Sequence, residues 1–387
     1  MLLPRPKDAR RPTMLELFFD LVYVVVLALI SQRLESGPGW LDALHALILL
    51  MALWWVWAVT VLVSNLYDPQ HSLIQLTTLC ALVGSLLMTA AIPTAFGPHG
   101  VVFASAYVGI HLTRGFLLAP ALRGQPEARA RAISVLSWFT ASGALWIAGG
   151  VSDGTRRVVL WAVALGIDSL GFGLRFPVPR LRRLASPRFF VVSDHLAERL
   201  QQFFIISLGD AILIIGIAMS RSGFEASHLT AFAVTLGSTV LLWRIYRHRA
   251  GQVLPMAIET IGGPNGSAQG TLYSHLVMMT GVVVTAASFA LAIHDPAGAV
   301  TTAWVLIALG GPALFLAGRA RFEYEVFRRV SPQRLVAIVV LAAAVPGARH
   351  LPALAVTATG TLVLAGVAAA DTVRSHGRPA ELPAPAQ

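Results

Sequence analysis

Long apolar stretches recur along this chain, and they limit its fold more than any other feature. There are twelve of them, most about 17–25 residues long, which is the length that lets a helix cross a bilayer. Backbone polar groups inside the hydrocarbon layer must be bonded within the segment, so such stretches fold as helices. We therefore expect an all-α, polytopic membrane helix bundle. The predicted spans are 15–32, 41–63, 73–96, 100–119, 132–150, 158–174, 198–220, 229–243, 272–293, 300–317, 335–348 and 351–370.

Composition agrees with this class of protein. The chain is 56% hydrophobic and 12% charged, whereas soluble domains carry about 25% charged residues. The formal net charge of +10 does not indicate nucleic-acid binding, because the basic residues lie between apolar runs rather than along one face. The single cysteine, Cys80, excludes an internal disulfide and a cysteine-based zinc site.

The distribution of basic residues predicts the topology. With the N-terminus inside, 22 of the 29 Lys and Arg fall in cytoplasmic segments and 5 in outer loops, which is the positive-inside pattern. Twelve spans then place both termini in the cytoplasm. We expect one integral-membrane domain over residues 1–374, with halves 1–175 and 190–374 if six spans are duplicated, and a disordered cytoplasmic tail at 375–387. The eleventh span, 335–348, is short enough to be a re-entrant segment instead.

Ionisable residues inside the spans gather in the half nearer the cytoplasm. A charge in the hydrocarbon layer costs about 2.5–3.5 kcal/mol or more, so each is a candidate functional residue. In the first span, Glu16, Asp20 and Tyr23 share one helical face at i, i+4 and i+7. Glu16 can also be read as a helix cap. Asp20 lies one turn deeper and needs a partner, so the sequence predicts a cytoplasm-facing polar pocket.

The second, fourth and sixth spans add polar residues at the same depth. Asn65 and Asp68 end the second span, where a turn before Pro69 is the alternative interpretation. Arg114 is too deep to reach the interface and is expected to pair with a carboxylate. The other candidates are Trp57, where packing is the favoured alternative, and His111 and Asp168.

The seventh span carries the strongest functional pattern. Arg199, Gln202 and Asp210 align on one face, and Arg199 and Asp210 are about 16 Å apart along the axis at 1.5 Å per residue. They cannot pair with each other, so each needs partners on other helices. Asp194 and Glu198 lie at the start of this span.

The candidate residues divide by expected role. The catalytic candidates are Asp20, Asp168 and Asp210. The substrate-binding candidates are Glu16, Tyr23, Trp57, Asn65, His111, Arg114, His195, Arg199, Gln202 and His275. The candidates for a Mg²⁺ site are Asp68, Asp194 and Glu198, because Mg²⁺ is bound by one or two carboxylates together with substrate phosphates.

Three motifs resemble a known family. Glu16–Val24 reads Glu-Leu-Phe-Phe-Asp-Leu-Val-Tyr-Val, Trp54–Trp57 is followed by Asn65 and Asp68, and His195–Arg199 is followed by Ile205–Asp210. Together they are similar to the bacterial low temperature requirement protein A family, in which glutamate is typical at the position of Asp210. The resemblance implies a multi-pass protein of the bacterial cytoplasmic (inner) membrane and brings no catalytic residues.

Two functions remain open at this stage. One is a Mg²⁺-dependent membrane-embedded enzyme acting on an isoprenoid or lipid diphosphate, with arginines receiving the phosphate oxygens. The other is a proton-coupled secondary transporter of a small molecule, which suits buried carboxylates and a duplicated architecture. A scaffold without chemistry explains the deep charges less well. The sequence favours the enzyme over the transporter by a small margin, and leaves the substrate and the oligomeric state open.

Overall fold

The computed structural model describes residues 11–37, 39–179, 181, 192–251, 253–261, 269–376 and 383–384. Its helices cluster into two compact units. Unit 1 comprises Met1–Leu29 and Leu44–Arg199, and unit 2 comprises Ile30–Ala43 and Leu200–Gln387. Most of the predicted disordered tail at 375–387 lies outside the described residues, and its first residue, Ser375, ends α14.

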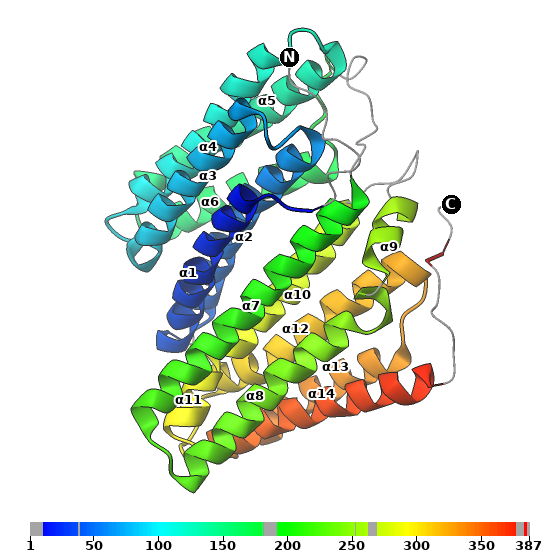
Figure 1. The fold of residues 1–387 in the computed structure, drawn as a ribbon. Helices are drawn as coiled ribbons and strands as arrows, with labels where there is room; N and C mark the ends of the chain where they lie inside the picture. Colours follow the sequence, from blue (N-terminus) through cyan, green and yellow to red (C-terminus); the bar gives the residue numbers. More distant parts are fainter. Residues whose placement is uncertain are drawn as a thin grey trace. The chain divides into compact units, whose positions relative to one another are not determined.

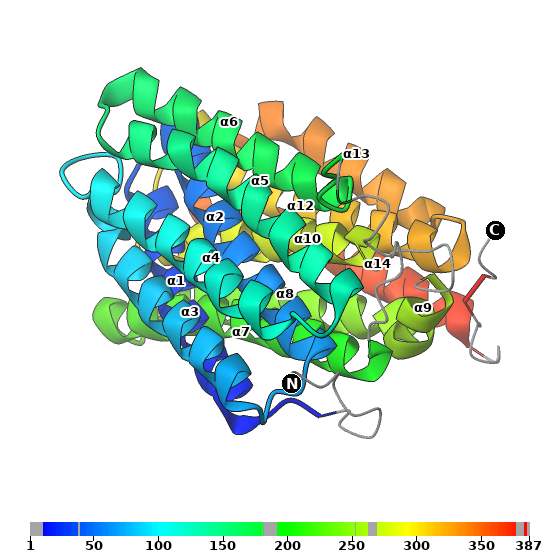
Figure 2. The same cartoon turned by 90° about the horizontal axis from the view of Figure 1, so that it is seen from above.

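Unit 1 is built from long apolar helices. They are α1 (Met14–Ser36), α2 (Trp40–Leu66), α3 (Ser72–Ala91) with the short η1 (Ile92–Thr94), α4 (Gly100–Ala121), α5 (Pro126–Gly150), α6 (Gly154–Gly173) and the start of α7 (Ser193–Ser222). The last turns of α1 and the first turn of α2, within Ile30–Ala43, belong to unit 2. Helices α3, α4, α5 and α6 pack in chain order, each against the next (Figure 2).

Unit 2 contains the rest of α7 and the helices that follow it. These are α8 (Ala226–Arg247), η2 (Arg249–Gly251), α9 (Leu254–Ile261), α10 (Gln269–Ala287), α11 (Phe289–His294), α12 (Thr302–Phe327), α13 (Pro332–Ala348) and α14 (Ala353–Ser375). Helix α12 packs against α10, α13 and α14, and α14 also packs against α8 (Figure 1).

Local sequence signals explain where several helices begin and end. Thr301 precedes α12 and its side chain accepts a hydrogen bond from the Trp304 amide at 3.1 Å, which satisfies one of the unpaired N–H groups of the first turn. Proline opens α5 and α13, where its fixed φ suits the first turn. Arg328 ends α12 in the left-handed conformation, with φ of 54°.

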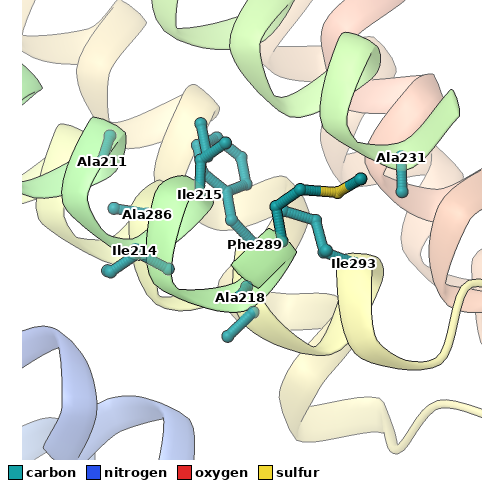
Figure 3. Packing of buried hydrophobic residues seen from close by; sticks show 10 residues of the cluster. Ala211, Ile214, Ile215, Ala218, Ala231, Ala286, Phe289 and Ile293 are labelled. Atoms are coloured by element: carbon teal, nitrogen blue, oxygen red, sulfur yellow. The ribbon is translucent and has the colours of Figure 1, made fainter. Parts of the chain in front are cut away.

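Small residues allow α10 and α12 to approach closely. A Cβ atom on Gly281 would meet the backbone of Phe315, and one on Gly311 would meet the backbone of Thr285. Close contact between backbones through small residues is typical of helix pairs in membranes, where lipid is as apolar as the side chains. The apolar core of unit 2 continues beside this contact, where Ile215, Phe289 and Ile293 form one buried cluster (Figure 3).

The structure confirms a polytopic helical bundle. Ten helices are long and apolar enough to cross a membrane, among the residues that the structure describes. The ten agree with ten of the predicted spans. The predicted sixth span corresponds to α6, which is 20 residues long and is not among the ten, and the eleventh corresponds to α13, a shorter apolar helix of 17 residues.

One helix extends far beyond its predicted span, in a way that matters for charge. The hydropathy pattern ends the tenth span at Ala317, but α12 continues to Phe327. The added turns carry Arg319 and Glu323, and both side chains are buried. Their burial is compensated by other charged and polar groups that bond to them. A hydropathy pattern does not detect such partners.

The topology of the chain can be tested directly. If α6 and α13 both cross the membrane, the number of spans is even, and the excess of arginine places both termini in the cytoplasm. A reporter active only in the periplasm should be silent after Gln387 and after residue 181, and active when inserted after Gly223 in the loop between α7 and α8. A periplasmic signal after Gln387 would contradict the twelve-span arrangement.

Candidate functional site

Helices α1 and α7 carry two pairs of ionisable residues with the same spacing. Glu16 and Asp20 lie four residues apart on α1, and His195 and Arg199 lie four residues apart on α7, so each pair occupies one helix face. The His195 Nε2 lies 2.8 Å from Glu16 Oε1, and the Arg199 Nη2 donates to Asp20 Oδ1 at 2.8 Å. All four side chains are buried in unit 1. The prediction that Asp20 needs a partner is confirmed.

Asn65 sets the protonation state of His195. Its amide is held in one orientation by the backbone of Val192, whose N–H donates to Oδ1 at 2.9 Å and whose carbonyl accepts from Nδ2 at 3.0 Å. The second Nδ2 hydrogen is therefore directed at His195 Nδ1, 2.9 Å away. That nitrogen must accept, so the imidazole is neutral and its Nε2–H donates to Glu16.

Trp57 extends this set, whereas Tyr23 bonds to the backbone of α2. Trp57 on α2 donates from Nε1 to Asp20 Oδ1 at 2.9 Å, and its ring lies 6.0 Å from the Arg199 guanidinium carbon. Tyr23 donates to the Leu53 carbonyl at 3.1 Å. We call Glu16, Asp20, Trp57, Asn65, His195 and Arg199 the α1–α7 network. Within it Asp20 Oδ2 and the Nε and Nη1 of Arg199 are buried without a hydrogen-bond partner.

A second network is centred on α4. Tyr107 donates to Asp168 Oδ2 at 2.8 Å, and Trp146 Nε1 donates to the same oxygen at 3.2 Å. One turn along α4, the His111 ring stacks on Phe139 with 3.7 Å between centroids. We call Thr60, Tyr107, His111, Arg114, Trp146 and Asp168 the α4 network.

Arg114 lacks the carboxylate partner that the sequence predicts. Its Nη2 donates to Thr60 Oγ1 at 2.5 Å and its Nη1 to His111 Nδ1 at 3.4 Å, and no carboxylate among the described residues pairs with it. Asp168 on α6 is engaged elsewhere, because Tyr107 and Trp146 donate to it. Thr60 lies three residues after Trp57, so the two networks of unit 1 adjoin on one face of α2.

The predicted Mg²⁺ ligands do not form a cluster. Asp68 accepts a hydrogen bond from the Gln70 amide at 2.9 Å, as in an Asx turn, and is half-buried. Asp194 and Glu198 are half-buried near the start of α7. Within the described part of the chain, no group of three or more His, Cys, Asp and Glu could hold a metal ion. The Mg²⁺ site stays a prediction.

Three of the candidates belong to unit 2. Asp210 is fully buried near the middle of α7 and accepts a hydrogen bond from Ser31 Oγ at 2.6 Å. His275 lies on α10 between the Thr271 carbonyl, 2.7 Å from its Nδ1, and the Tyr246 hydroxyl, 3.2 Å from its Nε2. Gln202 has a buried Oε1 without a hydrogen-bond partner.

Unit 2 also holds a charge network that sequence reasoning missed. Arg334 on α13 donates to Glu323 on α12 at 2.9 Å and to Asp371 on α14 at 3.0 Å, and all three side chains are buried. Arg319 donates to the carbonyls of Ile245 and His248 at the end of α8. The i, i+4 spacing of Arg319 and Glu323 is a signal that could have been found.

His248 lies just beyond α8, beside this network. Burial is the main cause that lowers its pKa, and the neighbouring guanidinium of Arg319 lowers it further, against the opposing effect of Asp371. His248 therefore favours the neutral form.

Comparison with known proteins identifies the family. The model of the bacterial low temperature requirement A proteins matches residues 11–369. The chain belongs to this family. A protein of Rhizobium meliloti (strain 1021), described as uncharacterized, is 35% identical over 316 residues, which cover 80% of this chain and 76% of that protein. No solved structure matches the chain.

Family membership confirms the resemblance that the three motifs indicated. Together with the apolar helices, it shows a bacterial multi-pass membrane protein. The matched residues include the whole α1–α7 network, the whole α4 network and Asp210. The name of the family indicates no substrate or reaction.

Proposed function

We propose that this protein is a proton-coupled secondary transporter in which Asp210 binds the coupled proton. The observation that supports this most is the surroundings of Asp210. Its carboxylate is buried in a membrane-spanning helix, its Oδ1 has no hydrogen-bond partner, and no described Lys, Arg or His pairs with it. An uncompensated charge at such a place costs several kcal/mol, which a bound proton removes.

Ser31 can serve both protonation states of Asp210. Its Oγ lies 2.6 Å from Asp210 Oδ2 and 3.5 Å from the Val283 carbonyl oxygen. When Asp210 is ionised, the hydroxyl donates to the carboxylate. When Asp210 is protonated, the same hydroxyl can accept from the carboxyl group and donate to Val283. A residue that loads and releases protons needs a neighbour of this kind.

The Mg²⁺-dependent enzyme has weaker support. That hypothesis needs Asp68, Asp194 and Glu198 to hold a metal beside substrate phosphates. Asp68 instead closes a turn through Gln70. The described residues provide no three-ligand group for a metal.

Replacing Asp210 by asparagine tests the proposal without a known substrate. We expect a rapid proton-concentration jump on proteoliposomes to produce a charge displacement with the wild-type protein and none with Asp210→Asn. The swap keeps the size of the side chain and removes a buried ionisable group, so folding should be retained. Infrared difference spectra over a pH titration should lose one carboxyl band in the same variant.

Asp153→Asn is the matched control, because the Asp153 side chain is 95% exposed. It should leave both the charge displacement and the carboxyl band unchanged. An Asp210→Asn protein that folds and still gives the wild-type charge displacement would remove Asp210 from the mechanism.

A further inference from the structure

Arg114 differs from every other buried arginine that the structure describes. The buried arginines are Arg114, Arg157, Arg199, Arg319 and Arg334. Arg199 and Arg334 pair with buried carboxylates. Arg157 and Arg319 donate to backbone carbonyl oxygens, and Arg157 also pairs with Asp153 at 3.3 Å. Arg114 donates to a threonine hydroxyl and an imidazole, which are neutral groups without a carbonyl or carboxylate oxygen.

The imidazole beside Arg114 adds a second donor. A guanidinium can only donate, so His111 Nδ1 must accept from Arg114 and the ring proton must lie on Nε2. That nitrogen is buried and has no hydrogen-bond partner. Phe139 stacks on the ring and Tyr107 packs edge-on at 4.7 Å, so the ring is held in place. The α4 network thus presents one buried positive charge beside His111 Nδ1 and one buried N–H donor at Nε2 of the same ring.

A buried guanidinium without a counter-charge is costly unless an anion completes it. Arg114 and His111 are each only 4% exposed, so bulk water does not solvate them well. Asp168 is held by Tyr107 and Trp146, both neutral donors. The counter-charge that suits Arg114 is therefore one that arrives with a ligand.

We infer that Arg114 and His111 bind the anionic group, a carboxylate or a phosphate, of a small organic molecule. Charge-assisted hydrogen bonds from a guanidinium to such oxygens are among the strongest available to a side chain. Thr60 positions the guanidinium by accepting from its Nη2. Calling this ligand the transported substrate rests on the proposed function, whereas the binding itself does not.

Direct binding to purified protein tests the inference separately from proton coupling. The probes are benzoate for a carboxylate, phenyl phosphate for a phosphate and benzamide as the uncharged analogue of benzoate. We expect at least one of the two anions to bind and to raise the melting temperature, and benzamide to do neither. The relative affinities of benzoate and phenyl phosphate distinguish a carboxylate ligand from a phosphate ligand. Asp210→Asn should bind the same anion, which separates this result from the proton-coupling experiment.

Arg114→Gln should weaken binding of that anion by about tenfold or more, because a hydrogen bond to a charged group is lost. It strands no carboxylate, so its melting temperature without probe should not fall below that of wild type. Arg123→Gln, an exposed arginine just beyond α4, is the matched control and should bind normally. If Arg114→Gln fails to fold, the comparison of benzoate with benzamide on wild type still decides. Binding of neither anion, equal binding of benzamide, or undiminished binding by Arg114→Gln would overturn the inference.

Discussion

Replacing Arg334 by glutamine is expected to lower the free energy of unfolding by about 3–5 kcal/mol, because it strands two buried carboxylates. Glu323 and Asp371 are 6% and 4% exposed, and Arg334 is the only described arginine or lysine paired with either of them. The three residues come from α12, α13 and α14, so the loss should loosen three helices of unit 2 together.

Glu323 has a further role that Arg334 supports. Its two oxygens accept from the N–H and the hydroxyl of Ser331, at 3.0 and 2.6 Å, immediately before α13 begins at Pro332. A carboxylate at a helix N-terminus is favourable, since it satisfies unpaired N–H groups and complements the helix dipole. Without Arg334 this carboxylate would be buried and uncompensated on its other side.

Titration with SDS in mixed micelles measures the change in unfolding free energy. Arg244→Gln is the matched control, because Arg244 is exposed and donates to Thr372, which lies next to Asp371 on α14. Its loss should cost less than about 1 kcal/mol. A triple variant with Glu323→Gln and Asp371→Asn should recover much of the stability lost with Arg334→Gln. If Arg334→Gln costs no more than the control, the network does not hold these helices together.

The class of fold follows from the sequence because hydropathy and helix length are local properties. Ten of the predicted spans agree with long apolar helices. Hydropathy does not predict the burial of charged residues that are compensated by other groups, as at Arg319 and Glu323. It scores each charged residue by itself as unfavourable for a buried, apolar segment. A single sequence does not show which distant charge will neutralise it.

The candidate site was partly predictable for a related reason. Spacing on one helix shows that Glu16 and Asp20 share a face, and the same rule applies to His195 and Arg199. It cannot show that these two faces meet. The neutral partners were missed because a single hydroxyl in an apolar run, such as Thr60 or Ser31, gives no pattern. The mistaken carboxylate partner for Arg114 came from treating every buried charge as paired within the chain.

The two pairs of the α1–α7 network should respond very differently to substitution. Asp20 and Arg199 form a buried ion pair at 2.8 Å, so Arg199→Gln strands Asp20 and should lower the free energy of unfolding by about 3–5 kcal/mol. Trp57 still donates to Asp20 in that variant but carries no charge. The double variant Asp20→Asn with Arg199→Gln removes both charges and should be more stable than Arg199→Gln alone.

The Glu16–His195 pair has almost the same distance but a different chemistry. Asn65 keeps His195 neutral, so Glu16→Gln breaks no ion pair with His195 and retains an acceptor for the Nε2–H. The second oxygen of Glu16 accepts from Thr13 at 2.8 and 3.0 Å, and these bonds are lost when that oxygen becomes an amide. The expected cost is about 1–2 kcal/mol. SDS titration of Arg199→Gln, Glu16→Gln and the double variant compares the pairs. A Glu16→Gln cost equal to that of Arg199→Gln would mean that His195 is protonated and that Asn65 does not fix its tautomer.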